Sequence, residues 1–325
     1  MRKRLLIRLL TPLLLAALFS SPSHPQSNPL WHTPKIKNYL PHMTWPEVDD
    51  LLSRTDMVII LIPAIEQHGP QLPIGTDYFI GEELAKLIAQ KTDVLVAPIL
   101  LPGISPYHME FPGTITLSAD TVQRVYFEAA QSLIHHGFRK FLLLPSHAGN
   151  QNVARYILDR INQETPGTAV DLGEAAAPFL QQPDKPSDKP DDKPAQNAQF
   201  DRHAGVRETS DGLYLFPTLV DMSKAEKTEL TFPDDLQEIL PQVVLGNPTA
   251  SRVFFAEALK PKDTGKHSST REMTKTGVWS EQDTRQATAA QGRQNMQAFV
   301  DASVQFINQW KALQPPKPLS QRRSY

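Results

Sequence analysis

Two apolar runs in the middle of the sequence constrain the fold more than any other feature. They read MVIILIP at residues 57–63 and KFLLLP at residues 140–145. Neither run alternates apolar with polar residues, so each predicts a strand buried on both faces, as in a parallel sheet covered by helices. Segments with helical spacing of apolar residues separate the two runs. This alternation predicts a layered α/β protein with a mainly parallel sheet.

The other expected elements follow from the same periodicity and from helix caps. Helices are predicted at about 45–54, 78–91, 119–136, 150–164 and 284–313, and shorter strands at 93–97 and 168–172. The apolar stripe along the last helix predicts packing against the core.

Composition excludes several classes of function. The 325 residues carry 33 Lys+Arg against 35 Asp+Glu, a net charge of −2, which does not favour nucleic acid as a partner. The sequence has no Cys, so disulfides, thiolate metal sites and a Cys nucleophile are excluded. Its 40% apolar residues suffice for a large core.

The two ends and one internal segment are expected to lie outside the folded domain. Residues 1–23 have a basic start and then an apolar run, the layout of a signal peptide. The protein is therefore expected to be exported, periplasmic or secreted, without stable membrane association after cleavage. The domain is predicted at 44–313, with a disordered Pro/Asp/Lys-rich insertion at 181–199 and a flexible tail at 314–325.

Polar residues of a kind that binds metals follow the first apolar run. Ligands of α/β sheets gather beyond the carboxyl ends of the strands, and Glu66, His68 and Asp77 follow residues 57–63 within one stretch of twelve residues. Carboxylates and imidazoles are suitable ligands for divalent metal ions. The alternative is that these are loop residues, with Asp77 as the N-cap of the next helix.

Two further segments supply residues of the same types. His147 follows the second apolar run, and His203 and Glu208 follow the internal insertion. Alone, the last pair is also consistent with a capped helix start and a surface Glu. Together, Glu66, Asp77 and Glu208 carry three negative charges. Two divalent ions with a hydroxide balance these charges better than a single ion does, because uncompensated buried charge is costly.

The first of these segments resembles a motif of the creatininase (creatinine amidohydrolase) family. That motif resembles E-Q-H-G-P-H-L-P followed by G-T-D. Residues 66–73 and 75–77 match it, except that Gln71 stands where His is usual.

Later segments resemble the same family. Residues 145–150 are a looser match to N-G-H-G-G-N, and residues 203–210 match H-A-G-x-x-E-T-S fully. FPGT at 111–114 and TGVW at 276–279 are also similar to family signatures. The likeness covers roughly residues 44–310.

The resemblance implies a three-layer α/β/α sandwich and a metal-dependent amidohydrolase. It implies two divalent ions per chain, Zn²⁺, Mn²⁺ or Fe²⁺, and family members often form homohexamers, so a homo-oligomer is expected. The implied metal ligands are Glu66, His68, Asp77 as a bridge, His147 and Glu208. Water activated by the two ions would attack the carbonyl carbon of a small-molecule amide, including a cyclic one, and the C–N bond would then break. His203 would act as the general acid/base for the leaving nitrogen.

Two departures from creatininase itself argue against creatinine as the substrate. Gly149 stands where creatininase has a ligand Glu, and Ala148 replaces an aromatic residue. His108, just before the FPGT segment, is a candidate to line the pocket, although a structural role is the alternative. Two other functions stay open. One is a lactonase or another hydrolase on the same metals, and the other is a non-catalytic exported protein that binds metal or solute.

Overall fold

The computed structural model describes residues 27–180, 199–232, 234–258 and 270–321. Within these ranges, four parallel strands form the central sheet in the order β2-β1-β3-β4. The strands are β1 (Met57–Leu61), β2 (Leu95–Ala97), β3 (Lys140–Leu144) and β4 (Thr168–Asp171). The predicted signal peptide lies outside the described residues, as does all of the predicted insertion except residue 199.

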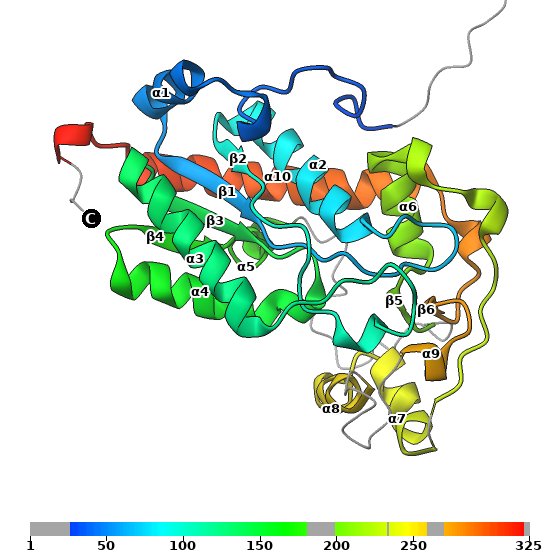
Figure 1. Cartoon of the computed structure of the whole chain (residues 1–325). Helices are drawn as coiled ribbons and strands as arrows, with labels where there is room; N and C mark the ends of the chain where they lie inside the picture. Colours follow the sequence, from blue (N-terminus) through cyan, green and yellow to red (C-terminus); the bar gives the residue numbers. More distant parts are fainter. Residues whose placement is uncertain (1–26, 181–198, 233, 259–269, 322–325) are drawn as a thin grey trace, which may run out of the picture.

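Helices cover both faces of this sheet (Figure 1). The main helices are α1 (Trp45–Arg54), α2 (Thr76–Thr92), α3 (Ala119–His136), α4 (Gln151–Glu164), α5 (Leu172–Ala176), α6 (Val206–Leu215), α7 (Asp234–Val244), α8 (Pro248–Ala258), α9 (Thr270–Met273) and α10 (Ala289–Leu313).

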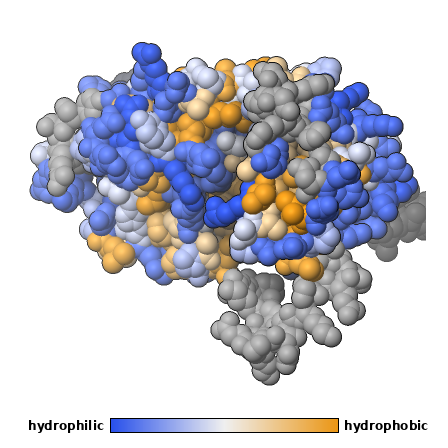
Figure 2. Space-filling view, turned by 90° about the horizontal axis from the view of Figure 1, so that it is seen from below, coloured by the Kyte–Doolittle hydropathy of each residue, from blue (hydrophilic) through white to orange (hydrophobic). Residues whose placement is uncertain are grey.

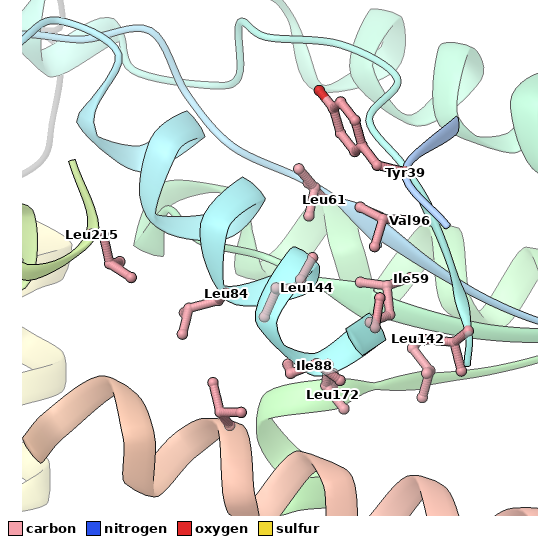
Figure 3. Close-up of a cluster of buried hydrophobic side chains, with 14 of the residues drawn as sticks. Tyr39, Ile59, Leu61, Leu84, Ile88, Val96, Leu142, Leu144, Leu172 and Leu215 are labelled. Carbon is pink, nitrogen blue, oxygen red and sulfur yellow. The ribbon is translucent and has the colours of Figure 1, made fainter. Parts of the chain in front are cut away.

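Alternate residues of each buried strand enter different cores. Ile59 and Leu61 of β1 pack with side chains of α2, α6 and α10 on one face of the sheet (Figure 3). Val58 and Ile60 pack with side chains of α3 and α4 on the other face. Both faces are apolar because both are covered, as the uninterrupted apolar run requires. The predicted α/β/α sandwich with a mainly parallel sheet is confirmed.

A smaller core lies beside this sandwich. It unites α7 and α8 with a short antiparallel pair, β5 (Asp201–His203) and β6 (Trp279–Ser280). Phe200, Phe232 and Phe254 form its centre, with ring centroids 5.3–5.8 Å apart. None of these elements was predicted from the sequence, and the two strands have only three and two residues.

Two predicted helix boundaries are wrong in informative ways. The helix expected from residue 78 begins at Thr76, so Asp77 lies in the first turn and is not the N-cap. The helix expected from residue 284 begins at Ala289, because Thr288 accepts a hydrogen bond from Gln291 N and caps the helix there.

The surface seen from below carries several separate hydrophobic patches among hydrophilic residues (Figure 2). No helix within the described ranges has the length and apolar character needed to cross a membrane.

Helix α10 lies unusually close to α6, the helix that follows β5. A Cβ atom added at Gly292 would stand 1.9 Å from the carbonyl oxygen of Ser210, a backbone atom that cannot rotate away. The hydroxyl of Ser210 also accepts a hydrogen bond from Thr288 N at 3.0 Å. Glycine at position 292 therefore allows α10 to pack this closely against α6, the helix that carries Glu208.

We expect Gly292→Ala to lower the free energy of unfolding by about 1–3 kcal/mol, because the two helices must separate. Helix propensity alone would favour Ala by about 1 kcal/mol. Urea unfolding followed by circular dichroism measures the change. The control is Gln294→Ala, an exposed position of the same helix, for which we expect a change within about 0.5 kcal/mol. A more stable Gly292→Ala variant would contradict the close approach.

Candidate metal centre

All six predicted site residues meet at one place in the fold. Glu66 and His68 follow β1, and His147 follows β3, the neighbouring parallel strand, so both loops leave the same edge of the sheet. Asp77 reaches this edge from the first turn of α2. These four residues are buried. The remaining two lie at the end of β5 and the start of α6, where the side chains of His203 and Glu208 are 12% and 18% exposed.

Two groups of candidate metal ligands occur among the described residues. One is Glu66, His68 and His203, and the other is Glu66, Asp77 and His147. The ligand atoms of each group lie within 4.8 Å of one another. Glu66 belongs to both groups, so it connects them.

Asp77 also connects two imidazoles. Its Oδ1 lies 3.3 Å from Nε2 of His68, and its Oδ2 lies 3.1 Å from Nδ1 of His147. One carboxylate therefore directs a different oxygen toward each histidine. Asp77 can therefore offer a ligand oxygen beside each of the two histidines.

Backbone carbonyls fix which nitrogen of each histidine faces the centre. The contacts are His68 Nδ1 to Glu66 O at 3.1 Å, His147 Nε2 to Ile104 O at 3.1 Å and His203 Nε2 to Gln67 O at 2.7 Å. A carbonyl oxygen only accepts, so each of these nitrogens carries the proton. In a neutral imidazole the opposite nitrogen then has a bare lone pair, as metal-binding histidines require.

These inward-facing nitrogens lie against carboxylates, so each gap between them is a place for a proton or a metal ion. Within the described part of the chain, Glu66 Oε2, His68 Nε2 and Asp77 Oδ2 are buried and have no hydrogen-bond partner. Lone pairs that face each other in a buried site repel, and orphaned polar atoms are costly there. Cations between them would satisfy both sets of atoms, so these residues fit divalent metal ions.

The pKa values of these carboxylates and histidines also favour a positive charge between them. Burial alone would raise the pKa of Glu66, but His147 and His108 hold it well below its usual range. Burial would likewise lower the pKa of His68, whereas Asp77 is the main cause that raises it to about 9, so a proton on Nε2 supplies the positive charge at neutral pH until a metal ion replaces it. The carboxylates thus stay charged despite burial and stabilise a cation among them.

Glu208 lies at the margin of the centre. Its Oε2 is 3.9 Å from Nε2 of His68, and Glu208 belongs to neither of the two ligand groups. The same oxygen accepts a hydrogen bond from Ala204 N at 2.6 Å. Ala204 is buried with a φ of +54°, a strained conformation for a residue with a side chain. Glu208 therefore also holds the turn that presents His203.

Gln71, which stands where the family usually has His, supports this turn from the other side. It is buried, and its amide donates to the carbonyl of Ala204 at 2.7 Å and to Oγ1 of Thr209 at 3.1 Å. Gln71 therefore helps to hold His203 in place, and position 71 belongs to neither group of candidate metal ligands.

Gly149 is required by its surroundings. A Cβ atom there would stand 2.3 Å from the hydroxyl of Tyr107 and 2.4 Å from Nε2 of His147. Tyr107 and His147 are themselves in contact, with 2.9 Å between the hydroxyl and Nε2. The carbonyl oxygen of Ile104 would also be only 2.7 Å away, so the ligand Glu that the resemblance implies for creatininase at this position does not fit here.

His108 lies inside the cluster, with Nε2 3.5 Å from Oε1 of Glu66, as its place before the FPGT segment allowed. Sequence reasoning missed Tyr107, Gln67 and Thr270, which contact the site histidines. Tyr107 is next to His108 in the sequence, and this could have indicated that it lies near the site. Thr270 is separated from His108 by 162 positions, so only the fold brings them together.

Comparisons with known proteins agree with this geometry. The sequence model of the family Creatininase, described as creatinine amidohydrolase, matches residues 41–307. A 3-dehydro-scyllo-inosose hydrolase of Thermotoga maritima is 29% identical over 194 residues, which are 59% of this chain and 60% of that protein. The creatinine amidohydrolase of Pseudomonas putida is 26% identical over 204 residues, which are 60% of this chain and 78% of that protein.

Solved structures show the same fold. A creatinine amidohydrolase (creatininase) structure has a TM-score of 0.59 and 19% identity, and the match covers 86% of this chain and 99% of that one. Similar solved structures include a manganese form of creatininase and a zinc–zinc form of a creatininase mutant. The family match spans most of the sequence and contains every residue of the centre. The chain belongs to the creatininase family.

Proposed function

We propose that this protein is a metal-dependent hydrolase that cleaves a C–N bond, in an open or cyclic amide, of a small molecule. The observation that carries the proposal is the buried cluster in which imidazole nitrogens lie against charged carboxylates, some of whose atoms have no hydrogen-bond partner. Such a cluster is costly without cations, so a fold that retains it is expected to use them. Membership of the creatininase family supports hydrolysis as that use.

We propose two divalent ions per chain. Glu66, Asp77 and His147 would hold one ion, and His68 with His203 or Glu208 would complete the second site together with the shared carboxylates. Zn²⁺ and Mn²⁺ are the first candidates, as both occur in solved creatininases. When bound, such ions polarise a carbonyl and lower the pKa of water.

His203 is suited to move the proton. Its Nδ1 is bare, since Nε2 donates to a backbone carbonyl, and Nδ1 lies 3.7 Å from Oε1 of Glu66. It would accept a proton from the attacking water as the oxygen bonds to the carbonyl carbon. When the C–N bond breaks, the same proton passes to the leaving nitrogen. The products are a carboxylic acid and an amine.

The substrate is proposed to differ from creatinine. Gly149 has no room for the carboxylate that creatininase has there, so the surroundings of the second ion differ. Related proteins named above act on creatinine and on 3-dehydro-scyllo-inosose, and a third relative, 25% identical over 270 residues, is a mycofactocin precursor peptide peptidase of Mycobacterium tuberculosis. The inosose, a keto-cyclitol without an amide, makes a hydrolase of another bond the second candidate.

We also propose export and self-association. The first rests on the signal-like layout of residues 1–23, and the second on the resemblance to a family whose members form rings.

We expect the protein, loaded with Zn²⁺ or Mn²⁺, to hydrolyse at least one compound in a panel of small amides, cyclic ureides and lactones. A chelator should abolish the activity, and added metal should restore it, because water is not activated without the ions. Amine or acid release measured by mass spectrometry detects turnover. A protein that holds its full metal content but hydrolyses none of these compounds would support the alternative, a non-catalytic protein that binds metal or solute.

We expect Asp77→Asn to reduce the metal content from about two ions per chain to less than one, because the bridging charge is lost. Elemental analysis after reconstitution and gel filtration measures the content. The matched control is Asp211→Asn, a buried carboxylate on α6 that contacts Asn295 and lies outside both ligand groups. Equal metal content in both variants would contradict the assignment of Asp77.

We expect His203→Asn to keep the metal content and lower turnover by about 10²–10⁴-fold, because the proton carrier is lost. Turnover of the best panel substrate and elemental analysis are measured on the same samples. Arg202→Ala, an exposed neighbour, is the control and should keep turnover. Loss of one ion in His203→Asn would instead identify His203 as a ligand.

A further inference from the structure

His108 shares the centre without belonging to either group of candidate ligands found in the described residues. It ends a short 3-10 helix (Pro106–His108) and is buried. Its ring stacks on that of His203, with centroids 4.4 Å apart and an interplanar angle of 25°. Both rings direct one nitrogen toward Oε1 of Glu66, at 3.5 Å from His108 and 3.7 Å from His203.

The amide of Gln67 determines which nitrogen of His108 carries the proton. Oε1 of Gln67 accepts from Gly69 N at 3.0 Å, so its NH₂ end points the other way. One of these N–H groups donates to Gly277 O at 3.0 Å. The other has two neighbours at 3.0 Å, Nδ1 of His108 and Nε2 of His203. Nε2 of His203 already carries a proton for Gln67 O, so the acceptor is Nδ1 of His108.

Thr270 is compatible with this assignment. Its hydroxyl has two neighbours, Nδ1 of His108 at 2.8 Å and the carbonyl oxygen of Tyr107 at 3.2 Å, and donation to the nearer of the two agrees with Nδ1 as an acceptor. With Nδ1 as an acceptor, neutral His108 carries its proton on Nε2, the nitrogen that faces Glu66.

His108 therefore differs from the other three histidines in the position of its proton. In their neutral, metal-binding form His68, His147 and His203 present bare nitrogens to the centre, whereas neutral His108 presents an N–H. The distance of 3.5 Å from Nε2 to Glu66 Oε1 exceeds the 2.7–3.2 Å of an ordinary N–H···O bond. The donor is thus only weakly engaged and can turn to an oxygen of a bound molecule.

We propose that His108 is a catalytic residue whose Nε2–H hydrogen-bonds the substrate oxygen that becomes negatively charged when water attacks the carbonyl carbon. The inference rests on the proposed hydrolase function and adds a residue to it. His108 transfers no proton in this step. The proton of the water passes to His203 and then to the leaving nitrogen. In the stacked pair, His108 therefore supplies a hydrogen-bond donor and His203 a proton acceptor, and both nitrogens face Glu66.

Neutron diffraction from a deuterium-exchanged crystal of the metal-loaded full chain tests the position of the proton. We expect deuterium on Nε2 of His108 and none on its Nδ1. Deuterium on Nδ1 alone would leave a bare nitrogen facing Glu66 and would overturn the proposal. The result does not depend on turnover.

Calorimetric titration with inorganic phosphate, a tetrahedral anion, tests the donor itself. We expect His108→Ala to bind phosphate about tenfold or more weakly than the metal-loaded wild-type protein, because a hydrogen bond to a charged oxygen is lost. His108→Gln keeps an N–H donor and should restore most of the affinity. His136→Ala, an exposed histidine at the end of α3, is the control and should bind as the wild type does.

The outcomes separate this inference from the function on which it rests. Unchanged phosphate affinity in His108→Ala, a wild type that binds no phosphate, or loss of metal from His108→Ala would each overturn the role of His108. The expected pattern in a protein that hydrolyses no compound of the panel would support the anion donor. In that case the hydrolase function would be wrong, while the role of His108 as a donor to a bound anion would still be supported.

Discussion

The hydrogen bonds between imidazole N–H groups and backbone carbonyls are the constraint on which the centre depends. Three carbonyls, those of Glu66, Gln67 and Ile104, each accept from a different histidine. Because backbone atoms move only with the whole loop, they fix the tautomers firmly. The bare nitrogens that result then face buried carboxylates, and this arrangement is stable only with positive charge between them.

The fold supplies these carbonyls at the end of the parallel sheet. Glu66 and His68 leave β1 in extended chain, so their side chains point to the same side, and Gln67 between them points to the other. That alternation places Gln67 behind the rings of His108 and His203, where its amide contacts both. One short segment thus provides ligands on one side and control of neighbouring tautomers on the other.

The sequence predicts the part of the site that follows from local rules. The apolar runs locate the strands, and polar residues after a buried strand must meet at one edge, which places Glu66, His68 and His147 correctly. His203 and Glu208 were found through a motif, but their place depends on the positive φ of Ala204. The partners of His108 could not be predicted, because they come together only through long-range packing.

The space beside His147 is limited at position 149. Tyr107 fills the position beside Gly149, so a carboxylate cannot enter there. Any second ion must then take its remaining ligands from the turn that carries His203 and Glu208. A nitrogen that binds an ion cannot accept a proton at the same time. If Glu208 completes that site, Nδ1 of His203 stays available to the substrate, and the stacked His108 can supply the matching donor.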